Sequence, residues 1–175
     1  MHQLISVFGK DRPGLVAGLT NLLYKHRVNL GDMEMTRLGG IFALLVEFKY
    51  PDNEEEPLQE SLALFAEKKN LKINTVNAKP YEEQPLSIKP NTIITVYGAD
   101  KPGIVFKITD ILGQNNVNIT NLETSLKEKN DLYLLFLEAQ RPDEISLEKL
   151  KEKLETTAAE LQINIKVRQL DAPAL

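Results

Sequence analysis

The chain has 175 residues, of which 42% are hydrophobic and 26% are charged, and its formal net charge is −4. This composition is ordinary for a globular protein. Residues 1–85 hold 10 Lys and Arg against 12 Asp and Glu, and residues 86–175 hold 11 against 13. Neither half has the basic excess that binding to the phosphate backbone requires, so we expect no direct nucleic-acid binding.

The sequence also argues against a disulfide-bonded, secreted or membrane-spanning protein. It contains no Cys, which excludes a disulfide framework, a thiolate nucleophile and a Cys-based metal site. The first residues, MHQLISVF, lack the basic start of a signal peptide. The longest apolar run, Ile41–Val46, is far shorter than the roughly 18 residues of a membrane span. We expect a cytoplasmic protein that does not contact membranes.

An internal repeat organises the chain. Residues 4–36 return as residues 93–125 at an offset of 89 without a gap, and 12 of the 33 aligned positions are identical. At the centre of the two copies are Asp11-Arg12-Pro13-Gly14 and Asp100-Lys101-Pro102-Gly103. A repeat of this length predicts two similar domains of about 85 residues each.

Each copy opens with a strand that leads through this turn into a helix. In Leu4–Phe8, Ile5 and Val7 point to one face. Apolar residues from Leu15 onward follow a helical stripe that ends near His26, and in the second copy near Asn115. The composition places Pro13 at the first helical position, with Asp11 beside the positive end of the helix dipole.

A glycine follows the first strand in both copies, as Gly9 and Gly98. A glycine repeated at a strand end indicates either a positive φ angle or a close approach of another backbone segment. The sequence leaves both explanations open.

A hairpin and a second helix complete each copy. In the first copy, a strand over residues 28–36 leads through the turn Gly39-Gly40 into a strand over Ile41–Phe48. In the second copy, a strand over residues 117–125 leads through Lys127–Asp131 into a strand over Leu132–Glu138. The second strand of each pair is apolar at nearly every position, so we expect another domain or subunit to cover its second face.

Second helices are predicted over Pro57–Asn70 and over Ser146–Leu161, with Ser146 as N-cap, and final strands over Leu71–Val76 and Ile163–Val167. The order β-α-β-β-α-β predicts an α+β fold of two ferredoxin-like domains, each an antiparallel sheet with helices on one face. We place the domains at residues 1–78 and 92–168, a linker at 79–91 and a loose tail at 169–175.

This pattern resembles the ACT domain, a small regulatory module of amino-acid metabolism. The resemblance rests on the D-[RK]-P-G turn between strand and helix and on Val-Asn-Leu or Val-Asn-Ile opening the second strand, at residues 28–30 and 117–119. The tandem layout without a catalytic domain is similar to the glycine cleavage system transcriptional repressor group.

The resemblance implies that two domains meet edge to edge in one continuous sheet and that an amino acid binds near their interface. The residues that match the family's binding turn and strand opening are Asp11, Arg12, Gly14, Leu15, Val16 and Asn29, with Asp100, Lys101, Gly103, Ile104, Val105 and Asn118.

The chemistry of these residues suits a zwitterion. A helix N-terminus attracts a carboxylate, an Asp pairs with an ammonium group, and an Asn amide offers a donor and an acceptor. Structural roles compete with this interpretation. The Asp residues would cap their helices, the Gly residues would allow tight packing, the Asn residues would satisfy backbone groups, and Arg12 and Lys101 would be solvated charges.

No catalytic pattern stands beside the turns. His2 and His26 have no partners at metal-ligand spacing, and no nucleophile elbow or phosphate-binding loop is present. We predict a protein that is not an enzyme and has no cofactor or metal.

Two hypotheses follow for the function. In the first, the protein senses a small amino acid such as glycine or serine and acts through a regulatory protein or an enzyme, as a homodimer. In the second, it is a ligand-free interaction module that uses its sheets for assembly.

Overall fold

A computed structural model of the chain describes residues 2–77, 89–127 and 132–170. The chain divides into two compact units, Met1–Pro85 and Leu86–Leu175, which we call unit 1 and unit 2. Each is described by itself. Most of the expected linker and all but two residues of the expected tail lie outside the described residues, and the placement of the domain boundaries there stays a prediction.

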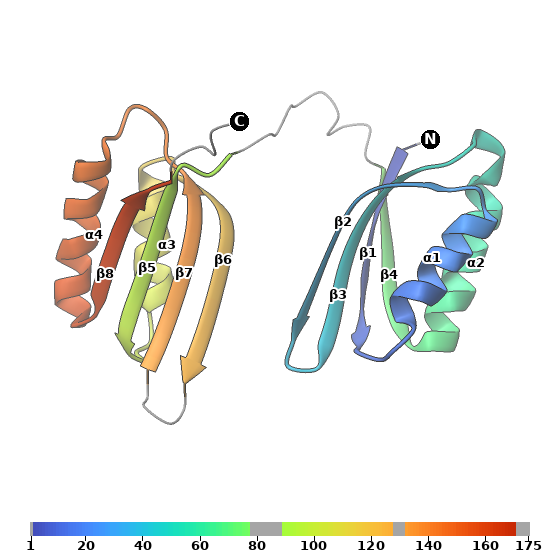
Figure 1. Ribbon diagram of the computed structural model, residues 1–175, viewed down its shortest axis with the longest axis horizontal. Helices are drawn as coiled ribbons and strands as arrows, with labels where there is room; N and C mark the ends of the chain where they lie inside the picture. The colour runs from blue at the N-terminus through green and yellow to red at the C-terminus, as the bar shows by residue number, and fades with distance from the viewer. Residues whose placement is uncertain (1, 78–88, 128–131, 171–175) are drawn as a thin grey trace. The chain divides into compact units, whose positions relative to one another are not determined.

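Both units have the predicted order of elements (Figure 1). Unit 1 consists of β1 (His2–Lys10), α1 (Leu15–Lys25), β2 (Asn29–Leu38), β3 (Ile41–Lys49), the short 3₁₀ helix η1 (Asp52–Glu54), α2 (Glu55–Lys69) and β4 (Leu71–Asn77). Unit 2 consists of β5 (Thr92–Ala99), α3 (Ile104–Gln114), β6 (Asn118–Lys127), β7 (Leu132–Gln140), α4 (Leu147–Leu161) and β8 (Asn164–Gln169).

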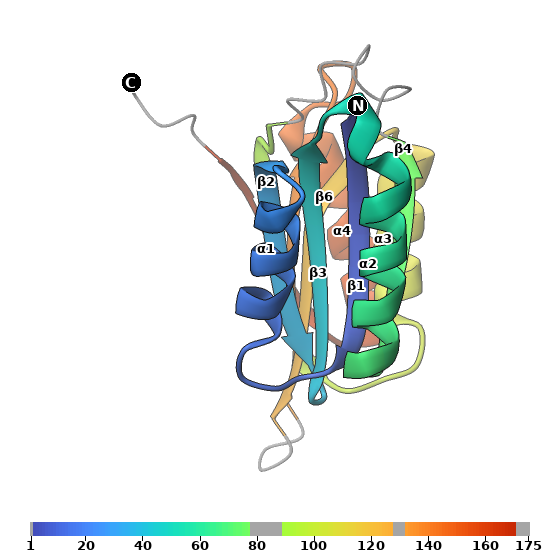
Figure 2. The ribbon, with the colours of Figure 1, turned by 90° about the vertical axis from the view of Figure 1, so that its right-hand side faces the viewer.

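The two sheets have the same topology. Their strand orders are β2-β3-β1-β4 and β6-β7-β5-β8, and neighbouring strands are antiparallel. Figure 2 looks onto the face of the first sheet that α1 and α2 cover. The predicted fold class, two ferredoxin-like domains with helices on one face of each sheet, is therefore confirmed.

The core of each unit lies between the sheet and its two helices. Ile5 and Val7 of β1 face the helices and are buried, as are Leu44 and Val46 of the neighbouring β3. Because successive strand residues point to opposite faces, the residues between them lie on the open face of the sheet. There Ile41 is 50% and Leu45 43% exposed, so no described part of unit 1 covers this face. The expectation that another domain or subunit covers it stays a prediction.

Gly9 and Gly98 are explained by close packing. Neither has a positive φ angle. A Cβ atom on Gly9 would lie 2.4 Å from Cδ2 of Leu71, and one on Gly98 would lie 2.9 Å from Cγ2 of Ile163. Leu71 and Ile163 stand where the second helix of each unit gives way to the last strand. The glycines thus let that junction lie directly against the end of the first strand.

Two boundaries differ from the prediction. Helix α1 begins at Leu15 after a turn at Pro13 and Gly14, so Pro13 is not the first helical residue. Strand β8 extends to Gln169, which pairs with Thr92. The N–H of Leu170 donates to the carbonyl of Asn91 over 2.8 Å, so residues expected in the linker and in the tail are part of unit 2.

We expect Gly98→Ala to lower the free energy of unfolding of unit 2 by about 1–3 kcal/mol, because the added methyl group overpacks the contact with Ile163. Gly113→Ala in α3 is the matched control, since a Cβ there meets nothing within 4 Å and Ala stabilises a helix interior by roughly 0.5–1 kcal/mol relative to Gly. Urea unfolding followed by circular dichroism measures both. Equal stability of the two variants would contradict the packing argument.

Candidate functional site

The D-[RK]-P-G turns have the same backbone geometry in both units. Gly14 has φ 84° and ψ 1°, and Gly103 has φ 91° and ψ −3°. These angles belong to the third residue of a type II turn, whose second position favours proline. A Cβ on either glycine would meet nothing within 4 Å, so glycine is needed for the positive φ and not for the tight packing we considered.

The helix N-termini behind these turns have no side-chain cap. Neither α1 nor α3 has a cap hydrogen bond or an acidic residue in its first turn. The interpretation of Asp11 and Asp100 as helix caps is therefore wrong. The first intrahelical bonds run from the N–H of Gly18 to Gly14 and from that of Lys107 to Gly103, each 2.9 Å long. The N–H groups that precede them have no carbonyl partner within the helix and suit an anion.

Arg12 and Lys101 anchor the turns. Arg12 donates from its guanidinium to the carbonyl of Lys69, the last residue of α2. Lys101 donates to the carbonyl of Leu161, the last residue of α4, over 2.8 Å, and to Oε1 of Gln162 over 3.1 Å. A cation at the C-terminus of a helix satisfies free carbonyls and the negative end of the dipole. Both residues thus have a structural role that competes with ligand binding.

Asp11 in unit 1 is engaged by the β2–β3 hairpin. Its Oδ2 lies 2.8 Å from Nε of Arg37, and its N–H donates to the carbonyl of Gly40 over 3.0 Å. The hairpin turn itself has positive φ at Gly39 and Gly40, as the sequence predicts. The negative charge of this turn is therefore largely neutralised inside unit 1.

Asp100 in unit 2 differs from Asp11. The position equivalent to Arg37 in the repeat is Leu126. Among the residues that the structure describes, Asp100 has no ion pair and no side-chain hydrogen bond. Burial raises the pKa of the Tyr133 phenol, and the negative charge of Asp100 raises it further. Within its described residues, unit 2 therefore presents an exposed carboxylate without an ion pair, close in sequence to a helix N-terminus that has no side-chain cap.

Leu15 and Ile104 belong to the hydrophobic cores. They are only 4% and 2% exposed, so neither residue offers its side chain to a ligand. Val16 is more exposed and Val105 is half-buried.

Asn29 and Asn118 are exposed but lie at the opposite end of their units from the turns. In unit 2, β5 ends at Ala99 opposite Leu132, whereas Asn118 pairs with Gln140 at the other end of β7. Eight residues of strand separate these levels, about 26 Å. Asn29 instead lines a hollow of about 300 Å³ beside a bulge of β2. No single unit brings its Asn and its turn together.

Strands β2 and β6 are edge strands that carry exposed apolar side chains. Each is paired on one side only. Met35 is 51% exposed on β2 and Leu122 41% exposed on β6. A long edge strand with apolar side chains and unpaired backbone groups is a template for pairing with another strand.

Comparison with known proteins decides the family. The model of the ACT domain matches residues 2–76 and again residues 91–168. The chain belongs to the ACT-domain family. The two ACT units are thus the two halves of the repeat, and the ACT domain is a regulatory domain that generally binds amino acids and oligomerises.

Relatives of known sequence match single ACT units. A UPF0237 protein of Methanopyrus kandleri is 30% identical over 79 residues, which are 45% of this chain and 87% of the relative. A UPF0237 protein of Streptococcus mutans is 31% identical over 75 residues, 42% of this chain and 85% of the relative.

Solved structures share the whole tandem fold. A protein of Galdieria sulphuraria with no assigned function has a TM-score of 0.80 at 23% identity, covering 97% of this chain and 98% of its own. A proposed glycine cleavage system transcriptional repressor has a TM-score of 0.72 at 19% identity, covering 98% of both chains. At these identities the likeness concerns the fold.

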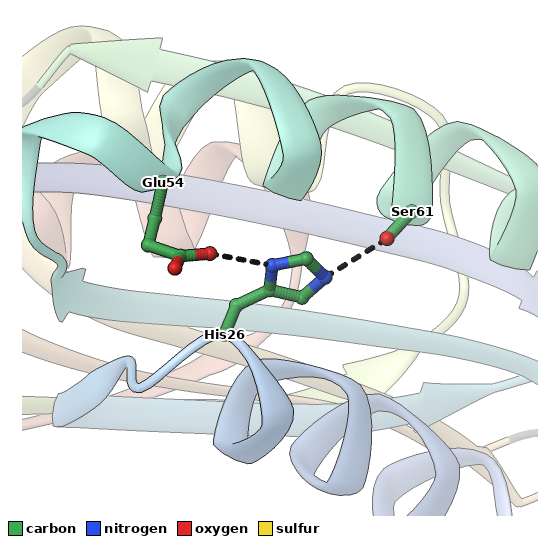
Figure 3. A network of polar contacts seen from close by, with 3 residues as sticks. All are labelled: His26, Glu54 and Ser61. Atoms are coloured by element: carbon green, nitrogen blue, oxygen red, sulfur yellow. Dashed lines mark hydrogen bonds and ion pairs between the residues drawn. The ribbon is translucent and has the colours of Figure 1, made fainter.

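One polar network was not predicted (Figure 3). His26, which ends α1, places Nδ1 3.0 Å from Oε2 of Glu54 and Nε2 2.9 Å from Oγ of Ser61. The order carboxylate, imidazole and hydroxyl is that of a catalytic triad. Hydrolysis also needs free donors for an oxyanion, and the N–H groups around Ser61 are used within α2. The network bridges two helices, and separations of 28 and 35 residues hide it from sequence analysis.

Residues 2–77, 89–127 and 132–170 contain no cluster of three or more His, Cys, Asp or Glu that could hold a metal ion. No helix in them is long and apolar enough to span a bilayer.

We expect Asp100→Asn to lower the pKa of Tyr133 while leaving it above 10.0, because burial is the larger cause of the upward shift. A raised phenol pKa contributes stability below the unfolded value, and this contribution is lost as the pH rises through the folded value. Ultraviolet titration of the phenolate measures the shift, with Tyr133→Phe identifying the signal and Asp110→Asn as charge control. An unchanged Tyr133 titration in Asp100→Asn would contradict the proximity of the two side chains.

Proposed function

We propose that this ACT-domain protein senses a small amino acid, such as glycine or serine, and acts through a protein partner in amino-acid metabolism or its transcriptional control. The observation that carries the proposal is that Asp100 has no ion pair among the described residues and precedes the N-terminus of α3, which has no side-chain cap. A zwitterion complements both charges at once.

The ligand would lie across the turn of unit 2. Its carboxylate accepts from the N–H groups of Ile104 and Val105, and its ammonium group pairs with Asp100. Lys101 stays on the C-terminus of α4 and holds the turn in place. The turn of unit 1 has the same backbone geometry, but Arg37 already forms an ion pair with Asp11. An ammonium group would therefore gain less binding free energy there.

A second copy of the chain would complete the site. When two edge strands pair antiparallel, the beginning of one lies opposite the end of the other. Pairing of β6 with β6 of a second copy therefore brings Asn118 of one chain to the turn end of its partner. In the described part of its own unit, the amide of Asn118 has no side-chain hydrogen bond. In such a dimer this amide would lie within reach of the ligand.

Such a site couples ligand binding to assembly. A ligand that contacts both copies stabilises the dimer by its differential affinity, and the dimer in turn strengthens ligand binding by the same factor. The binding of a partner protein that recognises the dimer would then depend on the amino-acid concentration.

A ligand-free interaction module is the competing function. The exposed apolar residues of β2 and β6 favour it as well, because strand pairing needs no metabolite. The two functions differ at Asp100, which an interaction module does not use.

We expect glycine or serine to give a measurable heat of binding in isothermal titration, and Asp100→Asn to weaken that binding at least about tenfold, the usual loss for a charge-assisted hydrogen bond. Asp11→Asn is expected to change it less, and Asp110→Asn on the exposed side of α3 not at all. Absence of heat from glycine, serine and the branched amino acids would favour the interaction module.

We expect Leu122→Lys to weaken self-association, because a buried lysine opposes edge pairing, without unfolding unit 2, in which Leu122 is 41% exposed. Sedimentation equilibrium of this variant and of Leu64→Lys, an exposed leucine on α2, measures the effect. Self-association that survives Leu122→Lys unchanged would contradict pairing through β6.

A further inference from the structure

A groove runs between α1 and α2 on the helical side of unit 1. Its volume is about 480 Å³. This is within the range of about 300–1,000 Å³ that is usual for small-molecule sites. It lies away from the strand–helix turn, along the seam where the two helices meet.

The walls of the groove are basic. Lys25 of α1 and Lys68 and Lys69 of α2 line it, and its lining contains no carboxylate. Within the residues that the structure describes, none of the three ammonium groups has an ion pair. This concentration of unpaired cations stands out in a chain whose net charge is −4.

The floor of the groove is apolar. Leu22 and Phe65 lie there, and Leu64 at its rim is 66% exposed. Gly18 lets the Phe65 ring lie against α1, because a Cβ there would be only 3.1 Å from the ring. An occupant therefore meets hydrocarbon below and ammonium groups at the sides.

The groove also includes two members of the network in Figure 3. His26 and Ser61 are among its lining residues. The carboxylate of Glu54 contacts His26 and is not itself part of the lining. The hydroxyl and imidazole groups supply hydrogen-bonding partners for a polar head.

Unit 2 differs at the equivalent positions and serves as an internal comparison. The second helices align by their last residues, Lys69 of α2 and Leu161 of α4, which places Glu160 at the position of Lys68 and Lys153 at that of Ser61. Lys107 stands at the position of Gly18, and its ammonium group pairs with Glu160 over 3.4 Å. Lys153 replaces Ser61 and donates to Asn115, which replaces His26, over 2.6 Å. The same seam in unit 2 is thus crossed by one ion pair, Lys107 with Glu160, and one hydrogen bond, from Lys153 to Asn115.

We propose that the groove between α1 and α2 of unit 1 binds an organic anion with an apolar body, that is, a carboxylate, sulfonate or phosphate attached to a hydrocarbon or aromatic group. The apolar part lies on Leu22 and Phe65, and the anionic group lies among Lys25, Lys68 and Lys69. This site is independent of the amino-acid site at the turn of unit 2.

The test uses the full chain and anilinonaphthalene sulfonate, an aromatic anion whose fluorescence rises on binding. Hexanoate is expected to displace it, whereas hexylammonium, with the same hydrocarbon and the opposite charge, is not. The double variant Lys25→Gln/Lys68→Gln is expected to bind the probe about tenfold more weakly, the combined effect of two exposed ion pairs. Lys149→Gln/Lys151→Gln on α4 makes the same change of net charge and is expected to bind like the original chain.

Amide chemical shifts locate the ligand. Hexanoate is expected to shift Gly18, Ser61 and Leu64, and glycine to shift Gly103 and Ile104, so failure at one site is distinguishable from failure at the other. Equal displacement by hexanoate and hexylammonium, equal affinity of the two double variants, or hexanoate shifts confined to the sheet would each overturn the proposal. Circular dichroism of both double variants verifies that the fold is retained.

Discussion

The close approach between the end of the first strand and the end of the second helix shapes both units. Gly9 and Gly98 have no side chain at this contact, and the following turn sends Arg12 or Lys101 to the last carbonyl of the second helix. Once the turn is held in this way, the left-handed glycine directs the chain into the first helix, whose N-terminus has no side-chain cap. The candidate ligand site is a consequence of this packing.

The two units keep this corner and differ around it. In unit 1, Arg37 forms an ion pair with Asp11. Unit 2 has Leu126 at the position of Arg37, and Asp100 has no ion pair among the described residues. Between the helices the difference is reversed. Unit 2 pairs Lys107 with Glu160, whereas Lys25, Lys68 and Lys69 of unit 1 have no ion pair among the described residues. The two units thus differ in their charges at the turn and at the helix seam, which favours a division of labour between them.

Features with a local physical signature could be predicted from the sequence. The repeat, the alternation of apolar residues in β1, the Gly39-Gly40 hairpin and the Ser146 cap were all predicted correctly. Each depends on neighbouring residues, so one stretch of sequence contains the information.

Features that depend on tertiary contacts could not be predicted in this way. Arg12 reaches a residue 57 positions away, and Asp11 is bound by Arg37 across a hairpin. The sequence also suggested that Asn118 shares a site with Asp100, although the strand register separates them within one unit. The sequence identifies residue types, but the register decides which of them meet.

Helix α2 offers a physical link between the groove and the D-[RK]-P-G turn of unit 1. Lys69 lines the groove with its side chain, while its carbonyl accepts the hydrogen bond from Arg12 in the turn. An anion that draws the last turn of α2 toward the groove would move the acceptor that holds Arg12. Because coupling between two sites is reciprocal in free energy, any ligand that orders the turn would also change the affinity of the groove. Arg12 is therefore the residue through which unit 1 would connect its two surfaces.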